Sequence, residues 1–516
     1  MRALLILALF FVVCYASSSR GVKQRHDRAE PRRSGPILSR ASSPRWFDGV
    51  ESNDIDMLLS RIFGKATNEK LRPRERYSSV DCRREPEHAA RCILSNVGFV
   101  NDTVIFYEDP ANPLSFVGPS VKYAFPAHYF GIRGGTDDHH FVNVSKRKGP
   151  IPENAIYADH DASYLIVPFW PQNQGHWLVD DLFASFSNML ELGIYVPNPQ
   201  LVIRQGCVDY FAGEKTSGVE YCHEFFLRRT KGYSSRDPLF LTENPYTRGS
   251  KAEKRNKHLK RAYENSDLIF QNLIGGHSTF ALMKRGEKRS LHWNLFRRHF
   301  LKKSGLFEPR LSRQQITVVQ KKGRRNILNF PDVLSATRGY GVDVVVYDPT
   351  VQSWEQQLEI MLRTTVLVTV PGGISFLAGF LQSSSVGLFF DAWDFQANRS
   401  YPLEGYWWEG LSAFRFLAYD YDASEASFPA GATDPSLLDH EMKVTAGLPT
   451  DRQLTVTDLH SDAKTLLYRF FTDIRVDLGR YQKSLCEALA IAEANKRWKR
   501  SYDYKACARA RGLVKQ

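Results

Sequence analysis

Residues 314–393 constrain the fold more than any other part of the chain. Runs rich in β-branched residues (ITVVQ, VDVVVYD, TTVLVTV and SVGLFFD) alternate there with the helix-like stretches FPDVLSATRGYG, SWEQQLEIMLR and PGGISFLAGFLQ. Strands that alternate with helices form βαβ units, whose strands are parallel. The sequence therefore predicts a doubly wound parallel α/β sheet in the second half of the chain.

Two chemical features follow strands of this predicted sheet. One is a basic loop with four cationic side chains: Lys321, Lys322, Arg324 and Arg325. The other is the pair Gly372 and Gly373, which opens a helix. Ligands of open α/β sheets bind at the carboxyl ends of the strands, and helix-start N–H groups with nearby cations suit a phosphate. We therefore expect a phosphorylated ligand in the C-terminal half.

The N-terminus has the pattern of a secretory signal. Arg2 precedes an apolar run at residues 3–16, and three serines follow it. This run is shorter than the ~20 residues that a helix needs to span a bilayer, and small residues fit cleavage after Ala16. Residues 1–16 are thus predicted to be a signal peptide or an uncleaved signal-anchor. In both cases the body enters the secretory pathway.

The rest of the chain divides by composition. Residues 17–75 begin with many Arg, Ser and Pro residues, carry part of the net charge of +13, and are expected to form a disordered basic stem. We expect an N-terminal α/β domain at 76–305 and a C-terminal α/β domain, ending in helices, at 306–516. No nucleic-acid recognition motif accompanies the basic charge, so a solvated surface is the favoured interpretation.

Cysteines and glycosylation sequons agree with a secretory route. Outside the predicted signal the chain has six cysteines: Cys82, Cys92, Cys207, Cys222, Cys486 and Cys507. An even number in an oxidising compartment predicts disulfides but leaves several connectivities open. Their grouping favours Cys82–Cys92, Cys207–Cys222 and Cys486–Cys507, with free buried thiols as the alternative. Sequons begin at Asn101, Asn143 and Asn398.

A second informative segment, at residues 168–193, reads PFWPQNQGHWLVDDLFASFSNMLELG and has apolar residues at helical spacing. On such a helix His176 and Asp180 share a face, and Asp181 lies ~100° further round. A histidine and a carboxylate near a helix start can act as a catalytic pair, in which one deprotonates a hydroxyl and the other orients it. The alternative is structural: His176 packs or caps, and the aspartates favour the positive end of the helix dipole.

The order of these motifs, over roughly residues 169–391, resembles that of the family 61 glycosyltransferases. That family includes plant xylan arabinosyl- and xylosyltransferases, the EGF-domain O-GlcNAc transferase and the protein O-mannose β-1,4-N-acetylglucosaminyltransferase. NQGHWLVDDL at 173–182 is similar to the family's N-x-x-H-x-x-x-D-D-L element, and KKGRRNILN at 321–329 to its R-x-x-x-R-x-I-x-N loop. LFRR at 295–298, SWEQ at 353–356 and VPGG at 370–373 lie where the family has F-R-x-x-L, S-F-x-E-Q and V-H-G-A-G-L-T-N.

The chain departs from the family pattern at four positions. Pro371 replaces a histidine, Ile374 a glycine and Leu377 an asparagine, so polar donors are lost. Lys321 replaces an arginine and keeps the charge but not the planar fork. These changes leave open a non-catalytic glycosyltransferase-fold binding or scaffold protein. A secreted hydrolase using His176 is a weaker alternative, because the chain has no G-x-S-x-G nucleophile turn.

The resemblance implies a GT-B fold, in which two Rossmann-like α/β domains face each other across a cleft. It implies inverting transfer from a UDP-sugar to a hydroxyl of a glycan or glycoprotein, with His176, Asp180 and Asp181 on the acceptor side. It assigns nucleotide-sugar binding to eight residues: Lys321, Arg324, Arg325, Asn329, Glu355, Gln356, Gly372 and Gly373. From the residues alone, Glu355 and Gln356 can equally belong to a capping box.

The resemblance also implies that no metal or other cofactor is required, because basic residues would stabilise the leaving diphosphate. The D-x-D triplets at 159–161 and 420–422 have the manganese-binding pattern of other glycosyltransferases, but so short a pattern is frequent by chance. The ending LVKQ differs from a KDEL-like signal, which favours the Golgi over the endoplasmic reticulum. Membrane attachment through the N-terminus and secretion both stay open.

Overall fold

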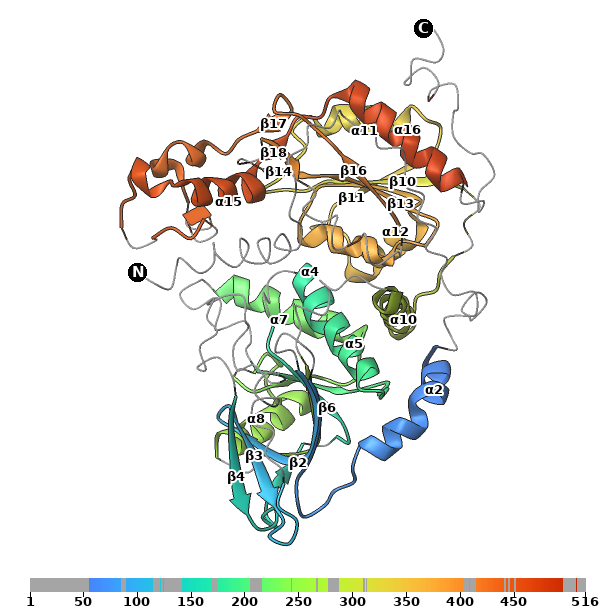
Figure 1. Ribbon diagram of the computed structural model, residues 1–516. Helices are drawn as coiled ribbons and strands as arrows, with labels where there is room; N and C mark the ends of the chain where they lie inside the picture. The colour runs from blue at the N-terminus through green and yellow to red at the C-terminus, as the bar shows by residue number, and fades with distance from the viewer. Residues whose placement is uncertain are drawn as a thin grey trace, which may run out of the picture.

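The computed structural model describes residues 55–494 and Cys507, with gaps at 85–89, 115–120, 122–123, 125–141, 159, 169–173, 205–215, 243, 266–267, 277–286, 310, 312, 395, 397, 402–407, 409–413, 440–441, 444–445 and 450–451. It has two principal β-sheets, each packed against helices (Figure 1). The predicted α/β class is therefore confirmed.

The C-terminal sheet is the one that the β-branched runs predict. It consists of β10 (Gln315–Val319), β11 (Asp343–Tyr347), β12 (Val366–Thr369), β13 (Val386–Phe390) and β16 (Arg415–Tyr419). All neighbouring pairs are parallel, in the order β11-β10-β12-β13-β16. From β10 the chain adds β11 on one side of that strand. It then crosses to β12 on the other side of β10 and continues in that direction through β13 to β16. The winding reverses between β10 and β12, and open α/β sheets bind ligands at such a switch point.

Helices cover both faces of this sheet. Alternate strand residues point to opposite sides, so apolar side chains emerge on each face and need a covering layer. Val318 and Val368 share a hydrophobic cluster with buried residues of α11 (Phe330–Arg338), α15 (Ser461–Phe471) and α16 (Leu478–Ala494). Val319 and Leu367 belong instead to the cluster of α12 (Trp354–Arg363) and the 3₁₀ helix η6 (Gly373–Phe380). A parallel sheet with both faces covered explains the near-continuous apolar strands.

The N-terminal sheet is mixed. Its strands are β1 (Ser79–Arg84), β2 (Ala90–Val100), β3 (Thr103–Glu108), β4 (Asn143–Lys148), β5 (Ile156–Tyr157), β6 (Ser163–Ile166), β7 (Gln200–Ile203), β8 (Leu239–Phe240) and β9 (Leu268–Gly276). The order is β4-β3-β2-β9-β6-β7-β8, with β1 beside β2 and β5 beside β9. The β6–β7–β8 half is parallel, whereas β2 is antiparallel to β1, β3 and β9. Helices α7 (Thr216–Lys231) and α8 (Lys251–Glu264) connect its parallel part.

Helix α10 (Glu287–Lys303) joins the two halves. Figure 1 shows it between the sheets, and Trp293 and Phe296 lie in the same hydrophobic cluster as α12 and η6. Trp293 Nε1 donates to the carbonyl of Gly379 at 3.2 Å, and Arg297 Nη2 donates to that of Phe380 at 2.9 Å. The helix that follows the N-terminal sheet is thereby fixed to η6 of the C-terminal sheet.

The expected stem differs from the structure at its end. Residues 55–70 form helix α2 (Ile55–Lys70), in which Ile55 and Leu59 are fully buried. Asp56 accepts a hydrogen bond from Tyr195 and forms ion pairs with His299 at 3.0 Å and Lys302 at 3.1 Å. The apolar spacing of IDMLLSRIF explains the helix, because Ile55, Leu58, Leu59 and Ile62 recur at helical intervals and the stretch has no proline.

Two of the favoured disulfides are confirmed. Cys82–Cys92 crosses β1 and β2 at directly paired positions, and Cys486–Cys507 ties α16 to a later residue. Cys207 and the side chain of Cys222 lie outside the described residues. Disulfides are consistent with a secretory-pathway or extracellular location. Within the described part of the chain, no helix is both long enough and apolar enough to cross a membrane.

The smaller described elements include two antiparallel strand pairs and three short helices. β14 (Ala392–Asp394) pairs with β15 (Arg399–Tyr401), and β17 (Ala426–Ser427) pairs with β18 (Asp473–Ile474), which follows α15. The 3₁₀ helices are η7 (Ala430–Ala432), η8 (Pro435–Leu437) and η9 (Val456–Asp458). The sequon residues Asn101, Asn143 and Asn398 are all exposed.

Candidate functional site

The predicted histidine helix is present, with an unusual centre. It begins as α4 (Gln174–His176), continues as the π-helix η5 (Trp177–Phe183), and ends as α5 (Ala184–Glu191). π-helical turns inside α-helices are rare overall, and those that occur are often found at functional sites. This one contains both predicted aspartates.

His176 and Asp180 form the expected pair. His176 Nδ1 lies 2.5 Å from Asp180 Oδ2. The Asp180 side chain is almost fully buried, whereas that of His176 is 20% exposed. Burial raises the pKa of Asp180, and the hydrogen bond from His176 opposes that rise. When Nδ1–H donates to the carboxylate, the imidazole keeps its lone pair on Nε2.

Asp181 belongs to a different environment. Asp181 is buried. The pKa of Tyr164 in β6 is raised mainly by the burial of that tyrosine, and the negative charge of Asp181 raises it further. Asn188 Nδ2 donates to the Tyr164 hydroxyl at 2.9 Å, and Arg91 Nε donates to Asn188 Oδ1 at 2.8 Å. The two aspartates therefore differ: Asp180 orients the histidine, and Asp181 lies in the polar interior above the N-terminal sheet.

The basic loop and the glycine turn converge at the switch point. Gly372, with φ +131°, directly precedes η6. A Cβ added at Gly372 would lie 2.7 Å from Arg325 Nη2 and 3.1 Å from Lys321 Nζ. Lys321 Nζ also donates to the carbonyl of Pro371 at 3.2 Å. Two cations thus lie against the backbone at Gly372, a position where only a residue without a side chain can be accommodated.

Two further members of the predicted set contact other parts of the protein. The Arg324 guanidinium carbon is 5.2 Å from the centre of the Phe471 ring. Asn329 Nδ2 donates to the Val476 carbonyl, and the Val476 N–H donates to Asn329 Oδ1, both at 2.9 Å. The described contacts of Asn329 therefore dock the loop onto the chain near β18.

Glu355 and Gln356 form the capping arrangement that their spacing indicates. Ser353 Oγ accepts from the Gln356 N–H at 3.3 Å, and Gln356 Oε1 accepts from the Ser353 N–H at 2.8 Å. Ser353 Oγ also donates to Glu355 Oε2 at 3.1 Å. The capping box is confirmed, and both side chains are exposed at the start of α12.

The start of the histidine helix meets the helix that Gly372 precedes. The rings of His176 and Phe376, which lies in η6, have centroids 6.2 Å apart. A Cβ at Gly175 would come within 2.1 Å of Phe376 Cδ2, so the backbone of α4 approaches this ring closely. Phe376 is the contact between the two predicted half-sites. The sequence offers no signal for it beyond its place four residues after Gly372.

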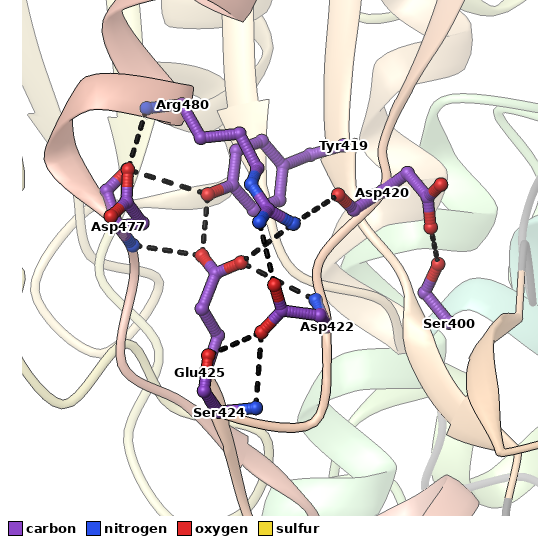
Figure 2. Close-up of polar contacts among 8 residues, drawn as sticks. All are labelled: Ser400, Tyr419, Asp420, Asp422, Ser424, Glu425, Asp477 and Arg480. Carbon is purple, nitrogen blue, oxygen red and sulfur yellow. Dashed lines mark hydrogen bonds and ion pairs between the residues drawn. The ribbon is translucent and has the colours of Figure 1, made fainter.

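The D-x-D triplet at 420–422 forms a separate cluster at the end of β16, which Figure 2 shows. Arg480 Nη2 donates to Asp422 Oδ2 at 2.6 Å, and Arg480 Nη1 lies 3.1 Å from Glu425 Oε2. Ser400 Oγ donates to Asp420 Oδ1. These carboxylates contact neighbouring side chains of the protein. The other triplet includes Asp159, which lies outside the described residues.

Comparison with known proteins adds no family. Neither a family model nor a curated protein matches the chain. Among the residues that the structure describes, no group of three or more His, Cys, Asp and Glu side chains could hold a metal ion. The resemblance to the family 61 glycosyltransferases thus remains a prediction from the motifs.

Proposed function

We propose that the protein is an inverting glycosyltransferase with a GT-B arrangement, which transfers a sugar from a UDP-sugar to a hydroxyl of a glycan or glycoprotein. The observation that carries the proposal is the contact between α4 and η6. It brings the His176–Asp180 pair to the helix that follows Gly372, next to Lys321 and Arg325. An acid–base pair and an anion-binding turn at one switch point suit transfer from a diphosphate donor.

On the acceptor side, His176 acts as the base and Asp180 orients it. The buried carboxylate accepts the Nδ1–H hydrogen bond, which places the basic lone pair on Nε2. As Nε2 takes a proton from the acceptor hydroxyl, the Asp180 carboxylate stabilises the imidazolium that forms. The acceptor oxygen then forms a bond to the anomeric carbon while the bond to the diphosphate breaks.

On the donor side, positive charge stabilises the departing diphosphate. Arg325 supplies a planar guanidinium, which can bind two phosphate oxygens at once. Lys321 adds a point charge at the same turn, and Gly372 lets the backbone approach the phosphates. The predicted signal and the two disulfides support a secretory-pathway or extracellular location, and the Golgi lumen or membrane stays a prediction from the sequence.

One observation favours a rival, a non-catalytic binding protein with the same fold. Ile374 and Leu377, which replace a glycine and an asparagine of the family pattern, are buried in the hydrophobic cluster. Pro371 offers the carbonyl that Lys321 contacts, where the family has a histidine side chain. A relative that keeps the cations but loses polar donors could bind a nucleotide without turnover.

The test is expression of the full chain in a secretory host, followed by thermal shift with UDP and donor hydrolysis across a panel of UDP-sugars. Arg325→Ala and Asp180→Asn are the matched variants. We expect UDP to stabilise the wild type and Asp180→Asn clearly and Arg325→Ala much less, and hydrolysis to fall at least tenfold in both variants.

The outcomes separate the candidates. UDP binding without turnover of any donor or acceptor would favour the binding-protein rival. A folded wild type that shows no response to UDP would sink the transferase proposal. Hydrolysis that survives in Asp180→Asn would remove the His176–Asp180 pair from the mechanism while leaving the donor site in place.

A further inference from the structure

The loop that carries the two cations has a strained backbone. Arg325 is not a glycine, yet its φ is +58°, in the left-handed region. A residue with a side chain is unfavourable in this region and persists there only where its surroundings enforce the conformation. The strain turns the buried Arg325 side chain toward Gly372. The groups that hold the backbone there consequently determine where the cation lies.

Asp473, at the start of β18, is the principal holding group. One of its oxygens, Oδ1, accepts from the Asn326 N–H at 2.6 Å and from Asn326 Nδ2 at 3.2 Å. The backbone of Arg325 also donates to this carboxylate. Asn326 Nδ2 donates in turn to the Gly323 carbonyl at 2.7 Å, which closes the loop on itself. The half-buried carboxylate is thus surrounded by N–H groups from both sides of the strained residue.

The chain around Asp473 is itself well anchored. Ile474 N–H donates to the Asn326 carbonyl at 2.9 Å, and the Leu328 N–H donates to the Ile474 carbonyl at 2.8 Å. β18 also pairs with β17. The Phe470 ring, near the end of α15, lies 5.5 Å from the Arg325 guanidinium carbon. The carboxylate therefore lies on a fixed support and not on a mobile loop.

We propose that Asp473 is a positioning residue, which holds the backbone at Arg325 and Asn326 so that the guanidinium meets the anionic ligand at Gly372. Asp473 acts through Arg325 and has no direct contact with the ligand in this assignment. The proposal rests on the proposed function for the identity of the ligand. The positioning itself is a property of the loop and can be measured without a ligand.

The first measurement is hydrogen exchange of peptides that cover residues 320–329 in the full chain. We expect at least tenfold faster exchange in Asp473→Ala than in the wild type. Asp473→Asn should stay within about threefold, because both Asn326 contacts reach the single oxygen that asparagine retains. Asp434→Ala is the control, since the Asp434 carboxylate also accepts a backbone N–H, that of Ser436, but in a local turn outside the loop. It should leave the loop unchanged.

The second measurement is the affinity for UDP by calorimetry. Asp473→Ala should weaken binding about tenfold or more, with Asp473→Asn close to wild type. Adding Asp473→Ala to Arg325→Ala should weaken binding no further, because a positioning residue has no effect once the positioned group is gone.

Unchanged exchange in a folded Asp473→Ala protein would overturn the proposal. Fully additive losses in the double variant would also overturn it, since Asp473 would then act independently of Arg325. If the wild type binds no UDP, the proposed function fails, and the exchange experiment still supports or overturns the positioning role.

Discussion

Two charged clusters lie at the carboxyl edge of the same parallel sheet, and they differ in the signs of the charges that meet there. At the end of β16, Arg480 lies between Asp422 and Glu425, so that opposite charges pair (Figure 2). Beyond β10 and β12, Lys321 and Arg325 bring two charges of the same sign to one glycine turn. An ion pair within the protein stabilises the protein itself, whereas two cations at one switch point favour an anionic ligand there.

The largest effect is expected for Gly372→Ala. The new Cβ would stand 2.7 Å from Arg325 Nη2 and would impose strain at φ +131°. We expect UDP affinity to fall at least tenfold, because the guanidinium must move away from the turn. Calorimetric titration of the purified variant measures this directly.

Gly341→Ala is the matched control for that substitution. Gly341 has φ +67°, but a Cβ there would have no atom within 4 Å. It precedes β11 and therefore lies near the opposite edge of the sheet. We expect a loss of stability from strain with unchanged UDP affinity. Equal losses of affinity in both variants would show that backbone strain, and not the crowding of Arg325, weakens binding.

A smaller effect is expected for Arg480→Ala, in the cluster at the end of β16. Glu425 is buried, but it retains the hydrogen bonds from the Tyr419 hydroxyl at 2.5 Å and the Asp477 N–H at 2.8 Å. We expect a loss of about 1 kcal/mol in the free energy of unfolding and no change in UDP affinity, checked by denaturant titration and calorimetry. A tenfold loss of affinity would contradict the division between the two clusters.

The smallest effect is expected for Asp422→Asn, and it depends on pH. The hydrogen bonds from Ser424 and Arg480 lower the pKa of Asp422 from its unfolded value of 3.8. A lowered carboxylate pKa stabilises the folded state above pH 3.8, and this contribution is lost as pH falls through the folded pKa. The melting temperature of the variant should therefore depend less steeply on pH below about 4 than that of the wild type. Identical slopes would contradict this account.

Local patterns in the sequence predicted much of the C-terminal sheet and its edge. The β-branched runs, the capping box at Ser353 and the helix after Gly373 are all present, because each depends on residues adjacent in the chain. The pairing of His176 with Asp180 followed from helical spacing in the same way.

Contacts between distant segments could not be predicted from such patterns. Asp473 holds Asn326 from 147 positions away, and no spacing rule connects them. The different environments of Asp180 and Asp181 depend on which side of the helix faces the N-terminal sheet. The π-helical turn that contains both aspartates gives no signal in the apolar periodicity, because Leu178, Leu182 and their neighbours fit an ordinary helix equally well.

The continuity of one hydrophobic cluster has a consequence for cooperativity. One hydrophobic cluster contains Trp177 and Phe183 from the histidine helix, Trp293 from α10, and Trp354 and Phe380 from the C-terminal sheet's helices. Separating the sheets would wet these aromatic rings, which costs free energy in proportion to the area exposed. The two halves are therefore coupled in unfolding, and a core substitution on either side is expected to lower the stability of both.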